Sequence, residues 1–171
     1  MKRGSKRARN GTARSSHFDE RGRARMVDVG AKPATAREAV ARGRVELSRE
    51  ALAAVVSGSA RKGDVLGVAR IAAIQAAKRT SEWIPLCHPL PLDALEVDFE
   101  TLEAPPAIEI EARARTTAKT GVEMEALVAV SAAALTIYDM LKSIDRAMAI
   151  GAIRLIRKSG GKSGTYERET P

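Results

Sequence analysis

A run of thirteen uncharged residues at 126–138 constrains the fold of this 171-residue chain more than any other feature. The run is flanked by Glu125 and Asp139 and consists mostly of Ala, Val, Leu and Ile. A helix that is apolar on all sides has to be buried on all sides. We therefore expect a long helix within residues 119–142 that packs on its own sheet and is covered on its other side, most simply by a second subunit.

Charge is distributed unevenly along the chain. The formal net charge is +8, but residues 1–25 contain nine Lys or Arg against Asp19 and Glu20. We expect residues 1–25 to be a basic, disordered N-terminal extension, with an organelle transit peptide as the alternative interpretation. Residues 26–171 are nearly neutral and are long enough for a single domain. A neutral domain does not attract nucleic acid, which is therefore not an expected partner.

Two observations concern the environment of the protein. Even the uncharged run at 126–138 is shorter than the ~20 apolar residues that a membrane-spanning helix needs, so no membrane contact is expected. Cys87 is the only cysteine, which excludes an internal disulfide and fits a reducing compartment. We therefore expect a cytoplasmic location.

Residue periodicity predicts an α+β fold. The order is strand, helices, strand, strand, helix, strand, which is typical of a ferredoxin-like βαββαβ sandwich. In that fold, helices cover one face of a four-stranded antiparallel sheet. Prolines at 85, 89 and 91 make residues 83–91 an extended loop. The predicted segments are strands at 44–48, 92–102, 107–117 and 153–157, and helices at 49–56, 64–79 and within 119–142.

The two ends of the long helix carry candidate site residues. Asp139 and Lys142 lie three residues apart and share one helix face. In a partly desolvated cleft they can transfer protons, although an ordinary surface ion pair is the simpler interpretation. Glu123 and Glu125 lie in the first turn, where the helix N-terminus stabilises carboxylates. Glu125 and Asp139 are about 21 Å apart along a helix, so a site that uses both ends requires two subunits.

The loop at 84–90 contains His88 between Cys87 and Pro89. Neighbouring side chains of an extended chain point in opposite directions, which argues against a nucleophilic pair of Cys87 and His88. A structural histidine is the alternative. One Cys and two His in the whole chain do not supply the four ligands of a closed zinc site.

Lysines occur in several predicted loops, at Lys62, Lys119, Lys158 and Lys162. The segment KSGGKSG at 158–164 resembles a phosphate-binding loop, but Ile156 stands where a P-loop requires Gly. A loop that wraps a phosphate and a frayed C-terminus both remain open.

Six motifs together are similar to the cyclic pyranopterin monophosphate synthase family, the protein C family of molybdenum cofactor biosynthesis. The resemblance covers residues 17–167. It implies a lyase that converts 3′,8-cyclo-7,8-dihydroguanosine 5′-triphosphate, a cyclised GTP intermediate, into cyclic pyranopterin monophosphate and pyrophosphate. It also implies a ferredoxin-like subunit in a homohexamer, a trimer of dimers with the active site at the dimer interface. The motifs are KGDV at 62–65, ARIAAIQAAKRT at 69–80, IPLCHPL at 84–90, KTGVEMEAL at 119–127, LTIYDMLK at 135–142 and KSGGKSG at 158–164.

The same resemblance implies roles for individual residues, with Asp139 usually assigned as the active-site residue. The implied catalytic residues are Asp139, Lys142, Lys62, His88, Glu123 and Glu125. The implied substrate contacts are Leu86, Cys87, His88, Met124 and Glu125.

The reaction that the resemblance implies needs proton transfers, for which Asp139, Lys142 and Lys62 are suitable donors and acceptors. Release of pyrophosphate also needs positive charge at the triphosphate. This interpretation requires no cofactor. Mg²⁺ at the pyrophosphate is compatible with it, but no pair of carboxylates in the sequence indicates a metal site. The alternatives are a non-catalytic oligomeric ligand-binding module, which would not need Asp139, and nucleic-acid binding through residues 1–25. The residues that we expect to bind the triphosphate are Lys32, Arg37, Lys119, Lys158 and Lys162.

Overall fold

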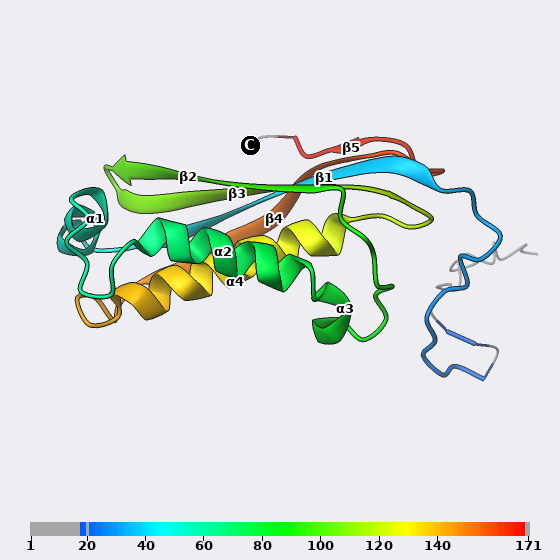
Figure 1. Ribbon diagram of the computed structural model, residues 1–171, viewed down its shortest axis with the longest axis horizontal. Helices are drawn as coiled ribbons and strands as arrows, with labels where there is room; N and C mark the ends of the chain where they lie inside the picture. The colour runs from blue at the N-terminus through cyan, green and yellow to red at the C-terminus, as the bar shows by residue number, and fades with distance from the viewer. Residues whose placement is uncertain (1–17, 20, 170–171) are drawn as a thin grey trace, which may run out of the picture.

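A computed structural model describes residues 18–19 and 21–169 of the chain. Within these residues it contains one antiparallel sheet with strand order β2-β3-β1-β4-β5. Helices α2 and α4 lie side by side on one face of this sheet, and α1 and α3 lie near opposite ends (Figure 1). The strands are β1 (Thr35–Glu46), β2 (Ala94–Glu103), β3 (Pro106–Ala118), β4 (Ala149–Ser159) and β5 (Tyr166–Glu167), and the helices are α1 (Arg49–Val56), α2 (Val65–Ala77), α3 (Thr80–Trp83) and α4 (Glu123–Leu141).

The α+β class and the antiparallel sheet are confirmed, but the prediction of four strands is wrong. A fifth strand, β5, pairs with Arg157 and Lys158 of β4. This strand is two residues long, too short for alternation to reveal it. The predicted extension at residues 1–25 lies mostly outside the described residues and stays a prediction.

Strands β1 and β4 are longer than predicted. β1 begins at Thr35 rather than at residue 44, and β4 spans Ala149–Ser159 rather than 153–157. The pairing of β1 with β4 shifts register between Val40 and Ala41 and again between Arg42 and Arg44. Such bulges interrupt the period-two alternation on which strand prediction depends.

Helix α4 forms the centre of the core. It packs against α2 and the sheet, and Ala129 and Ala133 are fully buried, as is Ala73 on α2. Small side chains at these positions allow the helix backbones to approach closely. By length and hydropathy α4 would pass as a membrane span, but 61% of that window is buried inside the protein, as in a core helix.

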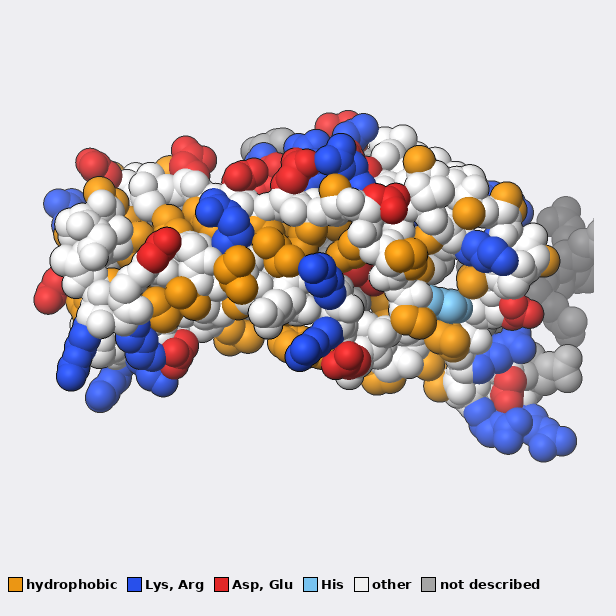
Figure 2. Space-filling view, in the orientation of Figure 1, with side chains coloured by type: hydrophobic (Ala, Val, Ile, Leu, Met, Phe, Trp, Pro, Cys, Tyr) orange, Lys and Arg blue, Asp and Glu red, His pale blue; other side chains and the backbone are white. Residues whose placement is uncertain are grey.

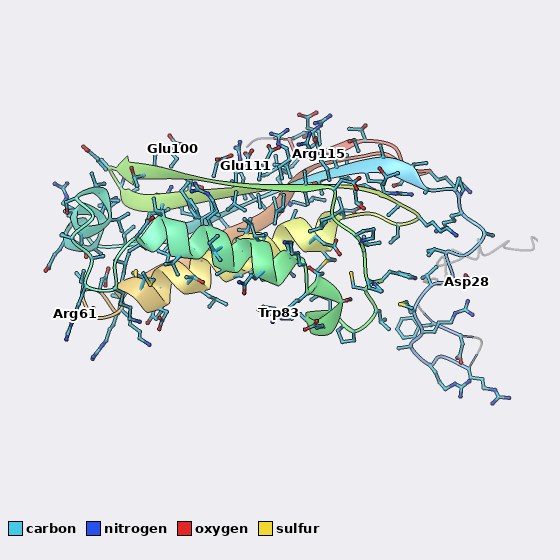
Figure 3. The ribbon with its side chains drawn as sticks, viewed as in Figure 1. Asp28, Arg61, Trp83, Glu100, Glu111 and Arg115 are labelled. Carbon is cyan, nitrogen blue, oxygen red and sulfur yellow. The ribbon has the colours of Figure 1, made fainter. Side chains whose placement is uncertain are left out.

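The opposite face of the sheet is charged. Arg42 pairs with Glu111 at 2.6 Å and Arg115 pairs with Glu96 at 2.7 Å, both across neighbouring strands (Figure 3). These pairs are partly exposed, so each contributes at most about 1 kcal/mol. This face of the sheet is therefore a solvated, charged surface.

Gly43 allows α4 to approach β1. A Cβ atom at this position would lie 2.5 Å from Cγ1 of Val130, whereas a Cβ at Gly151 on β4 would meet nothing within 4 Å. We expect Gly43→Ala to lower the free energy of unfolding by about 1–3 kcal/mol, because the core cannot absorb the added methyl group. Gly151→Ala is the matched control and should change it by less than about 0.5 kcal/mol. Urea denaturation measures both; equal values would contradict the packing argument.

Candidate functional site

One cluster of charged residues lies at the C-terminal end of α4. Asp139 accepts hydrogen bonds from Lys62 Nζ at 2.6 Å and forms an ion pair with Lys142 Nζ at 2.8 Å. Lys62 also donates to the Asp139 backbone carbonyl at 2.8 Å. The loop that carries Lys62 turns at Gly63, whose φ of 91° favours glycine, and ends at Asp64, the N-cap of α2. This turn brings Lys62 to Asp139 across 77 residues of sequence.

The two lysines determine the charge state of this cluster. Hydrogen bonds from Lys142 and Lys62 lower the pKa of Asp139 to about 2. The Asp139 carboxylate in turn raises the pKa of Lys142. At neutral pH the cluster therefore holds one carboxylate and two ammonium groups. Each of the three side chains is about half exposed, so the ammonium groups are accessible to an anionic ligand.

A second group of residues lies at the N-terminal end of α4. The Glu125 side chain is only 2% exposed, and its Oε2 atom has no hydrogen-bond partner in the described part of the chain. Burial raises the pKa of Glu125 to about 6, and the nearby Glu123 carboxylate also raises it. Glu123 itself pairs with Lys158 Nζ at 3.4 Å. Glu125 is thus a carboxyl group that can hold or release a proton near neutral pH.

Replacement of Glu125 by Gln is expected to change the pH dependence of stability. The pKa of Glu125 is raised from 4.5 to about 6 on folding, so the folded state binds this proton more tightly than the unfolded chain. The stability contributed by the protonated group is present below pH 4.5 and is lost as pH rises to about 6. This pKa difference corresponds to about 2 kcal/mol.

We therefore expect the free energy of unfolding of the parent to fall by up to about 2 kcal/mol relative to Glu125→Gln between about pH 4 and about pH 7. Urea denaturation at several pH values measures this difference. Glu100→Gln, at an exposed position of β2, is the matched control and should run parallel to the parent. The burial argument fails if Glu125→Gln also runs parallel to it.

A hollow of about 620 Å³ lies beside this second group. Its walls come from residues 27–32, the loop after α3, and the segment that leads into α4. Burial raises the pKa of Cys87, with further contributions from the Glu125 and Glu123 carboxylates, so Cys87 is a neutral thiol here. Six of the residues that the sequence singled out line the hollow, namely Lys32, Leu86, Cys87, His88, Glu123 and Met124.

The remaining basic candidates have other contacts. Arg37 donates from Nε to the Ala118 carbonyl at 3.0 Å and from Nη2 to the Lys119 carbonyl at 3.3 Å. Lys119 Nζ donates to the Gly30 carbonyl at 2.6 Å. Arg37 and Lys119 therefore hold backbone segments together, which the sequence did not predict.

The segment at 158–164 packs against the start of β1. Gly160 and Gly161 both have positive φ, and a Cβ atom at either would collide with the Ala36 backbone or the Arg37 guanidinium. Lys158 Nζ reaches both Ser163 Oγ, at 2.5 Å, and Glu123, whereas Lys162 is exposed. The segment is thus placed against the sheet and continues into β5, rather than fraying.

The structure does not bring the two groups together within one chain. Asp139 and Glu125 occupy opposite ends of α4, about 21 Å apart at 1.5 Å per residue. Figure 3 shows the same separation: Arg61, next to Lys62, and Asp28, in the segment that lines the hollow, lie at opposite ends of the molecule. Within one chain the two groups are therefore separate.

Sequence reasoning missed part of the hollow. Val27 and Val29 line it from a segment that precedes β1. The only signal was a short apolar run at 26–29 in polar surroundings. Across residues 18–19 and 21–169, no group of three or more His, Cys, Asp or Glu side chains is arranged to hold a metal ion.

Comparison with known proteins gives a consistent result. The family model described as the MoaC family matches residues 26–161. A cyclic pyranopterin monophosphate synthase from Thermomicrobium roseum is 63% identical over 92% of this chain and 95% of the relative. Proteins of the same name from Pelotomaculum thermopropionicum and Heliobacterium modesticaldum are each 60% identical over 90% of this chain, covering 91% and 97% of the relatives.

Proposed function

Because this chain belongs to the MoaC family, we infer that it is a cyclic pyranopterin monophosphate synthase, a lyase of molybdenum cofactor biosynthesis. This inference rests on the 63% sequence identity, over 92% of the chain, with a relative of that name. We propose that its substrate is the 3′,8-cyclised dihydroguanosine triphosphate and that its products are cyclic pyranopterin monophosphate and pyrophosphate.

In this proposal the lysine cluster supplies the proton donors. A carboxylate with a pKa of about 2, as at Asp139, is a weak base near neutral pH. Its role is then to hold Lys62 and Lys142 in place, and it raises the pKa of Lys142. The two ammonium groups, which are exposed and about 3 Å from Asp139, act on the substrate as acid groups and as counter-charges.

The hollow is proposed to receive the ring system. Leu86 and Met124 offer apolar walls, which suit a flat heterocycle. Glu123 lines the hollow and is an acceptor for ring N–H groups. Glu125 is buried beside the hollow rather than in its wall, and its pKa near 6 allows it to exchange a proton with the site during ring opening. His88 and Cys87 complete the wall. This arrangement supports substrate contacts by four of the five residues that the resemblance implies, namely Leu86, Cys87, His88 and Met124.

Phosphate contacts are proposed for Lys32, Lys158 and Lys162. Lys32 lines the hollow, and Lys158 is adjacent to Glu123. Arg37 and Lys119, selected from the sequence for the same task, already donate to backbone carbonyls. Mg²⁺ would need oxygen ligands that one chain does not arrange in its described part, so no step is assigned to a metal.

A second copy of the chain is proposed to complete the site. Apolar side chains lie exposed on the helical layer (Figure 2), among them Val68 at 45%, Ile71 at 56% and Leu135 at 56%. Burying them against another subunit would be favourable. We propose a two-fold arrangement with antiparallel α4 helices, which would place the lysine cluster of one subunit near the hollow of its partner. We extend this to a cytoplasmic homohexamer, a trimer of dimers. The strand order β2-β3-β1-β4 supports the ferredoxin-like fold that we propose for each subunit.

The test is direct conversion of the substrate. Purified full-length chain is incubated with the cyclised GTP intermediate, and pyrophosphate and a fluorescent oxidised pterin are measured. Formation of both supports the proposal. Binding of the intermediate without either product would instead indicate a non-catalytic ligand-binding module.

A further inference from the structure

Residues 26–32 form a strap along the hollow. Val27, Val29 and Lys32 line the hollow, whereas Met26 and Asp28 are exposed. The backbone of the strap makes no hydrogen bond to the sheet within the described residues. The backbone–backbone hydrogen bond that it does make is internal, from Lys32 N to Val29 O at 3.0 Å. The strap is therefore held by side chains of the body of the protein.

Two polar side chains attach the strap. His88 Nε2 lies 2.8 Å from the Val27 carbonyl oxygen, and Lys119 Nζ donates to the Gly30 carbonyl at 2.6 Å. His88 comes from the loop after α3 and Lys119 from the segment after β3. The strap thus joins two walls of the hollow that are far apart in sequence.

The contact between His88 and Val27 determines where the imidazole proton lies. A backbone carbonyl oxygen can only accept a hydrogen bond. Nε2 must therefore be the protonated nitrogen in this contact, and in the neutral ring Nδ1 carries the lone pair. The second contact, from Lys119, holds the strap so that the Val27 carbonyl stays in reach.

We propose that the strap is a positioning element for His88: the Val27 carbonyl fixes the ring with its proton on Nε2, which leaves Nδ1 as the nitrogen that acts on a ligand in the hollow. Nδ1 then accepts a hydrogen bond or a proton from the ring system of the substrate. Only this last step rests on the proposed function. The tautomer itself is a property of the free protein.

The test loosens the strap without touching His88. Val27→Gly with Val29→Gly removes the side chains that seat the strap in the hollow. Ala24→Gly with Arg25→Gly is the matched control, since it adds two glycines at exposed positions directly upstream of the strap. Each pair is made in the full chain with His17→Asn, because the chain contains only two histidines. ¹⁵N solid-state NMR of histidine-labelled protein then reports His88 alone.

When the His88 ring is neutral, the parent and the control should show a protonated Nε2 and an unprotonated Nδ1. The strap variant should show a mixture of tautomers and a kcat lower by about fivefold to tenfold, the loss expected for one hydrogen bond. The milder pair Val27→Ala with Val29→Ala should shift both quantities in the same direction and serves if the glycine pair does not fold.

A protonated Nδ1 in the parent, or an unchanged tautomer in a folded strap variant, would overturn the proposal. Turnover in the strap variant equal to that of the parent, with its tautomers mixed, would overturn the catalytic part. A parent that forms neither product refutes the proposed function instead, and the tautomer measurement still decides the positioning role.

Discussion

Replacement of Asp139 by Asn is expected to lower kcat by about 10²–10⁴-fold, the range associated with loss of positioned acid–base groups. The amide keeps the shape of the side chain but has no charge to hold Lys62 and Lys142, which lie 2.6 and 2.8 Å from the carboxylate. The fold should persist, because Asp139 is about half exposed and is not one of the buried core residues. Product formation and urea denaturation measure the two quantities.

The pH dependence of this loss separates an anchoring role from a titrating one. The pKa of Asp139 is about 2, so its carboxylate stays ionised throughout the neutral range, and the loss should be the same from about pH 6 to about pH 8. Asp98→Asn, at an exposed position of β2, is the matched control and should keep parental activity. Unchanged turnover in Asp139→Asn would remove Asp139 from the site and favour the ligand-binding module.

The helices and strands that the sequence predicted well are those in which apolar residues recur at an uninterrupted helix or strand period. Helix α1 has its predicted bounds, Arg49–Val56, with Ser48 as N-cap. Burial alternates from Leu95 to Glu100 in β2 and from Ile108 to Ala118 in β3. Bulges in the pairing of β1 with β4 concealed much of both strands, and β5 was too short to detect. Period-based prediction fails where the tertiary fold, rather than local alternation, determines pairing.

The candidate site was predicted unevenly for a similar reason. Residues adjacent in sequence, such as Leu86 with His88, were grouped by their motif. The contact of Lys62 with Asp139 spans 77 residues, and no local pattern encodes it; only the family resemblance suggested it. Arg37 and Lys119 look like phosphate ligands by charge alone, but which acceptor a loop cation reaches depends on the neighbouring backbone.

Mixing two inactive variants is expected to restore activity if two subunits share each site. Glu125→Gln disables the hollow and Asp139→Asn disables the lysine cluster, at opposite ends of α4. In a mixed dimer, one site combines an intact hollow with an intact lysine cluster, and the other site carries both defects. Random pairing makes half the dimers mixed, so turnover should rise from near background to about a quarter of the parental value.

The experiment needs the two variants in one assembly and a control that cannot complement. Co-expression gives the randomly paired population on which turnover is measured, and two different affinity tags verify that both variants are present in one assembly. Lys62→Met co-expressed with Asp139→Asn is the matched control: both changes affect the lysine cluster, so no site in a mixed dimer is intact. Recovery in the first mixture but not in the second requires that groups about 21 Å apart along α4 meet across a subunit interface. Background activity in both mixtures would mean that each chain works alone, and the second-subunit explanation of the uncharged helix would have to be abandoned.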